Sequence, residues 1–532
     1  MHRVVLPDPV IEGIGIGPVL GGKRVRGPGG CVHVGQSSRL SGISGNGGTL
    51  KRLLAALGAG VLLTASLPPF GWWPLALVGS GVLVLTLRDQ PLGWRLAVGL
   101  AAGVGLYAPG LWWVVDFSAP GYVVLVLVES AILAAALTLV PGQPTASRLL
   151  GFPAALVLAE LVRGHWPLGG LPLAGIDLGQ AASPLAPAAR LGGHLLLVFM
   201  VGLSGAAISL LVDARLRARA TGAAVALVVI LTPLLGDAAG SGAPGPALRV
   251  AAVQGGGPRG LRAVNVDPAT GFNAQLTATA GVRLPVDLVL WPENVVNVDG
   301  PLNGSPQDAA MSELARRLHT TIVSGVVEDV TSARGDQRFR NAAVAWAPDG
   351  SRVARYEKVH RVPFGEYVPA RSLVSRLADV SAVPRDAIAG NGPGVLPTPA
   401  GPLGVVISYE VFFADRARAA VEGGGQLLLV PTNASSYKTG QVPAQELAAA
   451  QLRAMETGSE VVQAAPTGYS ALVTADGRVT ERTGLGRAAV VEGEVRLRRG
   501  TTPATRYGEG ATTFLALMAL VAACTYRKLQ SA

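Results

Sequence analysis

Long apolar stretches dominate the first half of the chain and are separated by short turns. They lie at 53–68, 72–87, 96–115, 121–140, 149–162, 191–212 and 220–236. A straight transmembrane helix needs about 20 predominantly apolar residues, so some of these stretches are of spanning length and others are short. We therefore predict a domain of seven transmembrane helices over residues 49–237, with soft boundaries at the second and fifth helices.

The pattern changes near residue 248, where short apolar runs rich in β-branched residues alternate with amphipathic stretches. The predicted strands are 248–254, 286–292, 320–325, 341–348, 404–408, 426–432 and 460–465. The predicted helices are 306–319 and 442–458, the second ending in a glycine suited to a helix C-cap. Strands that alternate with helices indicate a layered α/β domain, which we place at residues 248–495.

The two ends of the chain differ from both domains. Residues 1–48 are rich in glycine, serine and basic residues, so we predict a disordered cytoplasmic tail. An apolar run at 511–524 predicts a final transmembrane helix at 508–526, followed by a short cytoplasmic tail at 527–532. The predicted fold class is thus a polytopic α-helical membrane domain of about eight spans together with an α/β domain.

Composition and charge agree with this division. The chain is 49% hydrophobic and 15% charged, with a mean hydropathy of +0.42, whereas a soluble protein carries about 25% charged residues. The chain has a net charge of +10, and basic residues such as Arg215, Arg217 and Arg219 cluster at the ends of apolar runs. This placement favours a topology signal over nucleic-acid binding. It predicts cytoplasmic termini and an extracytoplasmic α/β domain.

Ionisable residues inside the membrane half are Glu129, Glu160 and His194. Such residues are costly in a bilayer and are often functional. Glu160 could also simply pair with the nearby Arg163. Both interpretations stay open at this point.

Polar residues follow three of the strand-like runs in the α/β half. Glu293 follows an apolar run that ends in Trp-Pro, Lys358 follows an alternating strand, and Ser408 ends the run that begins at Gly404. Each residue also has a purely structural interpretation. Glu293 could cap a helix, Lys358 could belong to an ordinary basic hairpin, and Ser408 could be the polar end of a core strand. The three residues are also suited to acyl transfer. The carboxylate of Glu293 would take the proton of the nucleophile, Ser408, and the ammonium of Lys358, with a backbone N–H, would stabilise the oxyanion.

The order of short motifs in this half resembles the carbon–nitrogen hydrolase (nitrilase) superfamily. The motifs are WPE at 291–293, YEKVHRVPFGEYVP at 356–369, SYE at 408–410, PTN at 431–433, RAMETG at 453–458 and APTGYSA at 465–471. With eight predicted spans, the chain is similar to the apolipoprotein N-acyltransferases, the integral membrane branch of that superfamily. The resemblance covers nearly the whole chain from about residue 50.

The resemblance implies an αββα nitrilase-like sandwich and an acyl transfer that uses no metal or cofactor. An acyl chain would pass from a phospholipid, through an acyl-enzyme, to the N-terminal diacylglyceryl-cysteine of an apolipoprotein. Position by position, Glu293 matches the general base, Lys358 the catalytic lysine and Glu366 the glutamate that supports it. Tyr409 and Glu410 match the pair that follows the nucleophile.

The chain departs from that family at the nucleophile, where Ser408 stands in place of a cysteine. Its two cysteines, Cys31 and Cys524, both lie outside residues 248–495 and cannot substitute. A hydroxyl is a much weaker acid than a thiol and needs full general-base help. Its oxyester is also a poorer acyl donor than a thioester.

Two further departures concern recognition of the acceptor. The segment ASSY at 434–437 replaces a common Asp-Ala-Trp-type segment, and Glu446 stands where a histidine is common. The first hypothesis is an N-acyltransferase in which Ser408 accepts the acyl chain. The second is a catalytically impaired or silent paralogue that binds lipid or lipoprotein or serves as a scaffold. A third, an amidase on a membrane anchor, is disfavoured by the number of spans.

Overall fold

The structure is a computed structural model that describes residues 46–142, 145–260, 267–331, 335–376, 380–381 and 383–531. The predicted N-terminal tail lies outside the described residues, except for residues 46–48, which belong to the first helix. The chain from Gly48 onward, with its helical and α/β parts, is one compact unit.

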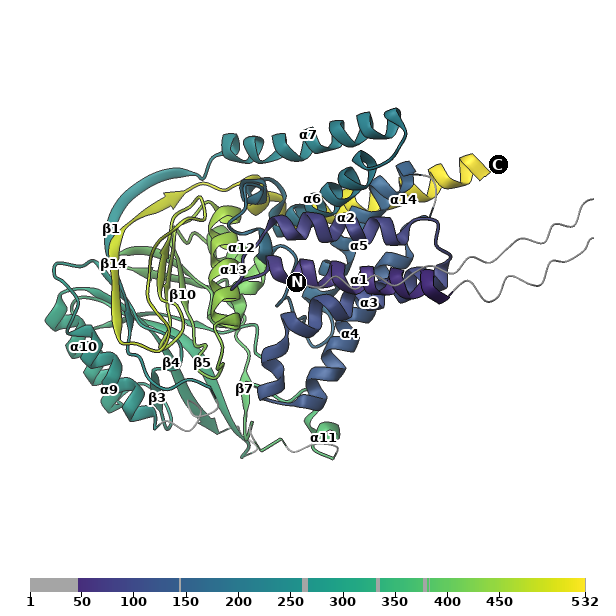
Figure 1. Cartoon of the computed structure of the whole chain (residues 1–532). Helices are drawn as coiled ribbons and strands as arrows, with labels where there is room; N and C mark the ends of the chain where they lie inside the picture. Colours follow the sequence, from purple (N-terminus) through teal and green to yellow (C-terminus); the bar gives the residue numbers. More distant parts are fainter. Residues whose placement is uncertain are drawn as a thin grey trace, which may run out of the picture. The chain divides into compact units, whose positions relative to one another are not determined.

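Eight helices of the described chain occupy the apolar stretches that predicted membrane spans (Figure 1). They are α1 (Asn46–Ser66), α2 (Pro74–Leu87), α3 (Leu92–Gly110), α4 (Ala119–Thr138), α5 (Thr145–His165), α6 (Ala189–Leu211), α7 (Leu216–Ala239) and α14 (Pro503–Ser531). Among the described residues, five helices are long and apolar enough to cross a membrane, namely α1, α4, α6, α7 and α14. The apolar helices therefore fit a multi-pass membrane protein, and the count of eight spans stays a prediction.

Helices α3 and α4 pack closely because α3 presents glycines to its neighbour. A side-chain carbon at Gly103 would lie 2.5 Å from Ser130 Cα, and one at Gly99 would lie 2.5 Å from Ala134 Cα. Any larger residue at these two positions would push the backbones apart. Small residues of this kind allow close helix contacts in lipid, where apolar burial alone does not drive association.

A buried ion cluster lies among these helices. The guanidinium of Arg163, on α5, pairs with Glu129 of α4 and, at 2.6 Å, with Glu160 one turn earlier on α5. The same group donates hydrogen bonds to the carbonyls of Leu171 at 3.2 Å and Leu173 at 2.6 Å. The predicted pairing of Glu160 with Arg163 is therefore present, and Arg163 fixes the segment that follows α5.

Two β-sheets form the middle of the α/β domain. The first has the order β14-β1-β2-β4-β5-β6, with β3 beside β4 and β7 beside β5. Its strands are β1 (Ala243–Gln254), β2 (Leu288–Leu290), β3 (Val296–Val298), β4 (Thr321–Thr331), β5 (Gln337–Trp346), β6 (Arg352–Glu357), β7 (Asp386–Ile388) and β14 (Ala489–Arg499). The second has the order β13-β12-β11-β10-β9-β8. Its strands are β8 (Val395–Thr398), β9 (Gly401–Val405), β10 (Leu428–Pro431), β11 (Val461–Ala464), β12 (Ala471–Val473) and β13 (Val479–Arg482).

Helices cover the outer faces of both sheets, so the domain is an αββα sandwich (Figure 1). The helices are α9 (Pro268–Thr279) and α10 (Pro306–Leu318) on the first sheet, and α12 (Ala414–Glu422) and α13 (Gln441–Thr457) on the second. An apolar core that includes Leu290 and Val405 lies between the sheets, and another that includes Trp291 and Met311 lies under α10. The predicted nitrilase-like sandwich is confirmed.

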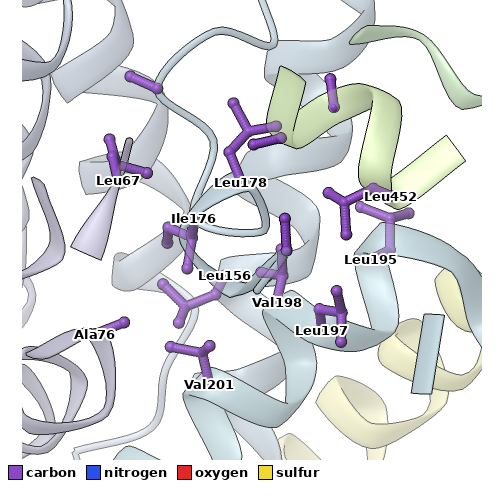
Figure 2. Packing of buried hydrophobic residues seen from close by; sticks show 14 of the residues in the cluster. Leu67, Ala76, Leu156, Ile176, Leu178, Leu195, Leu197, Val198, Val201 and Leu452 are labelled. Atoms are coloured by element: carbon purple, nitrogen blue, oxygen red, sulfur yellow. The ribbon is translucent and has the colours of Figure 1, made fainter. Parts of the chain in front are cut away.

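Helix α13 also packs against the membrane helices. Its Leu452 and Leu195 of α6 belong to one buried cluster, shown in Figure 2. Helix α6 is interrupted near this contact, where Gly193 has a φ of +70°. The freed backbone N–H of His194 donates a hydrogen bond to Glu456 of α13 at 2.6 Å. The helical and α/β domains therefore share a continuous core.

Replacing Arg163 by methionine would leave Glu129 and Glu160 buried without a counter-charge. Removal of one partner from a buried ion pair costs about 3–5 kcal/mol. We expect Arg163→Met to lower the melting temperature of the detergent-purified full chain by roughly 5–10 °C. Arg217→Met, at an exposed position of α7, is the matched control and should melt like the wild type. Equal melting of the two variants would contradict a structural role for the cluster.

Candidate active site

One buried ammonium group joins three of the predicted site residues. Lys358, directly after β6, donates hydrogen bonds to Oε1 of Glu293 at 2.9 Å and to Oε1 of Glu366 at 3.0 Å. Asn341 of β5 donates to the same two oxygens at 2.7 and 2.8 Å. The side chains of Lys358 and Glu293 are only 2% and 4% exposed. The three ionisable groups therefore interact without much screening by water.

Backbone geometry places the two carboxylates. Glu293 follows β2, and a side-chain carbon at Gly325 of β4 would lie only 2.4 Å from Glu293 Cα. Glycine at position 325 is therefore required for the close approach of these two segments. Glu366 belongs to a tight turn in which its own Oε2 accepts the backbone N–H of Val362 at 2.8 Å.

The charge state of Lys358 follows from these neighbours. Burial by itself lowers the pKa of an ammonium group. The carboxylates of Glu293 and Glu366 outweigh this effect, so the pKa of Lys358 lies well above its ordinary value. Lys358 therefore stays protonated at physiological pH and is suited to stabilising an anion rather than to acting as a base.

Ser408 begins a short 3₁₀ turn, η4 (Ser408–Phe412), shortly after β9. Its φ is +50°, in the left-handed region that is uncommon for residues other than glycine and that is enriched at functional sites. Its hydroxyl is buried, accepts a hydrogen bond from Thr432 Oγ1 at 3.2 Å and donates to Glu446 Oε1 at 3.5 Å. A sharp turn at the end of a strand is a common way to present a nucleophile.

Glu410 fixes the turn η4. Its Oε2 accepts the backbone N–H of Ile407 at 2.8 Å. Its Oε1 accepts the hydroxyl of Tyr356 at 2.9 Å and the backbone N–H groups of Val359 at 2.7 Å and His360 at 3.1 Å. One buried carboxylate therefore joins the nucleophile turn to the segment that carries the lysine.

Tyr409 joins the same turn to the helical domain. Its hydroxyl donates to the carbonyl of Gly170 at 2.8 Å, in the segment that Arg163 fixes after α5. Tyr367, next to the turn of the second glutamate, donates in the same way to the carbonyl of Leu168 at 3.2 Å. The candidate site therefore lies where the α/β domain contacts the membrane helices.

Thr432 connects the nucleophile with the lysine cluster. It follows β10, its hydroxyl contacts Ser408, and its carbonyl accepts the backbone N–H of Glu293 at 3.4 Å. Within the described residues, no hydrogen bond runs directly from Ser408 to Glu293 or Lys358. The structure thus brings the predicted site residues into one region, as two adjacent clusters.

Sequence reasoning gave no role to Thr432, which lies in the PTN motif, or to Asn341, and it noted Glu446 only as a departure from the family. Thr432 could have been found, because β10 runs parallel to β9 and the ends of parallel neighbours meet at one edge of the sheet. Asn341 begins an apolar stretch of β5 and carries no comparable signal. The contact of Glu446 depends on how α13 packs.

Comparison with known families supports the same class of protein. Residues 249–502 match the carbon-nitrogen hydrolase family, and residues 59–207 match the apolipoprotein N-acyltransferase N-terminal domain. The sandwich and its glutamate–lysine cluster, together with the first match, define a nitrilase-type protein of the carbon–nitrogen hydrolase class.

Full-length relatives identify the branch. The chain is 33% identical over 513 residues to the apolipoprotein N-acyltransferase of Azotobacter vinelandii, covering 90% of this chain and 96% of that protein. It is 31% identical over 501 residues to the enzyme of the same name from Mycolicibacterium smegmatis, covering 86% of this chain and 82% of the relative. The chain therefore belongs to the apolipoprotein N-acyltransferase family.

Two solved structures are similar to about half of the chain. Nit3 of Saccharomyces cerevisiae, a nitrilase-superfamily member, has 18% identity and a TM-score of 0.36, over 47% of this chain and 90% of that chain. An amidase from Nesterenkonia sp. has 22% identity and a TM-score of 0.34, over 49% of this chain and 94% of that chain.

Glu410→Gln tests the proposed fixation of η4. The amide keeps one acceptor oxygen but turns an N–H₂ group toward backbone donors, and each lost hydrogen bond to a buried charge costs about 1.5–3 kcal/mol. We expect amide exchange in residues 404–412 to speed up at least ~10-fold by hydrogen–deuterium exchange mass spectrometry. Glu422→Gln, exposed at the end of α12, should leave it unchanged. Unchanged protection in Glu410→Gln would show that the carboxylate does not hold the turn.

Proposed function

We propose that this protein transfers an acyl chain from a membrane phospholipid to the N-terminal diacylglyceryl-cysteine of apolipoproteins, through an acyl-enzyme on Ser408. The observation that carries the proposal is a buried hydroxyl on a left-handed turn, which Thr432 connects with Glu293 and so with the cluster in which two carboxylates keep the Lys358 ammonium charged. Family membership across both domains supports the substrate class.

In the first half-reaction, the oxygen of Ser408 attacks the ester carbonyl carbon of the phospholipid. Negative charge develops on the carbonyl oxygen, where the ammonium of Lys358 and a backbone N–H stabilise it. The bond to the glycerol oxygen then breaks, that oxygen takes up the proton that the general base removed from the Ser408 hydroxyl, and a lysophospholipid leaves. The acyl chain remains on Ser408 as an oxyester.

In the second half-reaction, the free amine of the apolipoprotein attacks the oxyester. A general base takes one proton from the attacking nitrogen, the Ser408 oxygen leaves, and a proton returns to it. Glu293 is the general base predicted from the sequence, and it also holds Lys358 in place together with Glu366.

We propose a multi-pass location in the cytoplasmic membrane, with the α/β domain on the extracytoplasmic face and both termini in the cytoplasm. The basic residues beside the apolar stretches support this orientation. The contacts of Tyr409 and Tyr367 with the segment after α5 support delivery of a lipid from the bilayer to the site. The partners are then the membrane, the phospholipid donor and the diacylglyceryl-modified apolipoprotein, and nucleic acid is not among them.

Purified full-length protein incubated with acyl-labelled phospholipid tests the acyl-enzyme. We expect about one acyl chain per protein molecule, removable by alkaline hydroxylamine as an oxyester is, on the peptide that contains Ser408. Ser408→Ala should abolish the adduct, and Ser312→Ala, on the outer helix α10, should retain it. A wild type without an adduct would end the proposal.

A catalytically silent member that binds lipid or lipoprotein is the second candidate. The serine at the position where family resemblance implies cysteine favours it, because a hydroxyl is the weaker nucleophile. In the same experiment this candidate predicts no adduct on the wild type and an adduct on Ser408→Cys.

A further inference from the structure

A basic patch lies beside the loop at 432–440, which connects β10 with α13. Three basic residues from separate segments form the patch: Arg259 after β1, Lys438 in the loop and Arg482 at the end of β13. Nη2 of Arg259 donates a hydrogen bond to the carbonyl of Thr439 at 2.8 Å. The guanidinium of Arg482 lies 4.2 Å from the centre of the Tyr469 ring. A side-chain carbon at Gly440 would lie 3.7 Å from the hydroxyl of that tyrosine, so these contacts meet at one place.

The positive charge of the basic patch is poorly balanced by the part of the chain that the structure describes. Lys438 pairs with Asp116 at 2.8 Å. No carboxylate among the described residues lies within ion-pair distance of Arg259 or Arg482. Glu481 adjoins Arg482 in sequence but occupies the opposite face of β13, because side chains alternate along a strand. Three cations therefore share one carboxylate.

Arg259 is the least well compensated of the three. Its side chain is partly buried, and its Nε is shielded from water and has no hydrogen-bond partner among the described residues. Burial accordingly lowers the pKa of Arg259. Removing a guanidinium from water without a counter-charge is costly, and an anion that accepts hydrogen bonds from its planar donors offsets that cost. The patch therefore has the charge and the free donor of an anion site.

The same loop contacts the ends of two membrane helices. Tyr437 packs edge-on against Trp113, with 5.1 Å between the ring centroids, in the turn η1 (Trp112–Asp116) that joins α3 to α4. Gln441, the first residue of α13, donates a hydrogen bond to the carbonyl of Gly110 at the end of α3, at 2.9 Å. In the proposed orientation this turn lies on the extracytoplasmic side. Its tryptophans then mark the level of the phospholipid headgroups.

The loop also begins beside the proposed nucleophile. Thr432 contacts Ser408, and the carbonyl of Ser435, three residues further on, accepts the backbone N–H of Gly260 at 2.8 Å. Gly260 is the neighbour of Arg259 in the chain. The Cα atoms of Thr432 and Ser435 are at most roughly 11 Å apart. A phospholipid carries its phosphate and its acyl esters on one glycerol, so the sites for the two groups have to be this close.

From this placement we infer that the basic patch binds the phosphate of the donor phospholipid and thereby brings its acyl ester to Ser408. The inference rests on the proposed acyl transfer and specifies how its first substrate is recognised. Arg259 provides the hydrogen-bond donors, and Arg482 adds positive charge. Because the cations of the patch outnumber its carboxylate, a phospholipid with a net negative charge, such as phosphatidylglycerol, binds more tightly than zwitterionic phosphatidylethanolamine.

Equilibrium lipid binding to full-length Ser408→Ala protein in a non-ionic detergent tests this inference. Without the nucleophile no turnover occurs, so the affinities do not depend on whether an acyl-enzyme forms. The ligands are radiolabelled ether-linked phosphatidylglycerol, phosphatidylethanolamine and dialkylglycerol with identical chains, measured by scintillation proximity. The dialkylglycerol lacks the phosphate and its headgroup. A diacylglyceryl-cysteine peptide represents the acceptor.

We expect Arg259→Gln to weaken binding of phosphatidylglycerol at least ~10-fold, as loss of a hydrogen bond between charged groups does. Arg482→Gln should weaken it about 3-fold, because an exposed charge contributes less. Both variants should bind dialkylglycerol like the parent protein. Arg317→Gln, at an exposed position of the outer helix α10, is the matched control and should bind all four ligands unchanged.

Three results would overturn the inference. Equal losses of phosphatidylglycerol and dialkylglycerol binding in Arg259→Gln would indicate a structural role. Unchanged binding of phosphatidylglycerol in that variant would show that the patch does not hold the phosphate. Loss of binding of the diacylglyceryl-cysteine peptide alone would assign the patch to the acceptor.

The exposed arginine keeps the test decisive if Arg259→Gln does not elute as folded protein. Unchanged affinity for phosphatidylglycerol in Arg482→Gln would then overturn the inference. The proposed function fails by a different result, the absence of an acyl adduct on the wild type. Failure of phosphate recognition and failure of acyl transfer are therefore distinguishable.

Discussion

The ammonium of Lys358 lies between two carboxylates in a part of the protein that excludes water. Removing such charges from water is costly, and their attraction offsets the cost only when the geometry is good and further hydrogen bonds are made. Asn341 provides these further hydrogen bonds, because its side-chain amide donates to both Glu293 and Glu366. These side chains come from separate segments of the first sheet and from the turn at 363–367. The charge arrangement therefore exists only in the assembled α/β fold, and the proposed chemistry depends on that arrangement.

A similar arrangement recurs among the helices, where Arg163 lies between Glu129 and Glu160. Its remaining hydrogen bonds fix the segment after α5, and that segment accepts the hydroxyl of Tyr409, the neighbour of the nucleophile. The Lys358 cluster thus determines the charges close to η4, and the Arg163 cluster fixes the segment that holds η4 against the helices.

Features that depend on local pattern could be predicted from the sequence, and features that depend on distant contacts could not. The apolar runs and the periodic stretch 442–458 correctly predicted helices, including α13. Strand β14 was missed because it is half exposed and is held by pairing with β1, far away in the chain. The motifs named Glu293, Lys358 and Ser408, whereas the contact of Glu446 with the nucleophile depends on how α13 lies over the strand ends. Span number was hard to predict because helices such as α5 contain buried charges that pair inside the bundle.

Complementation tests the central claim, acyl transfer through Ser408, most directly. The full-length chain is expressed in a bacterial host depleted of its own apolipoprotein N-acyltransferase, and a reporter lipoprotein is examined by mass spectrometry. The account predicts that the wild type restores growth and adds an acyl chain to the N-terminus of the reporter, and that Ser408→Ala does neither. Restoration by Ser408→Cys but not by the wild type, at equal amounts in the membrane, would contradict it.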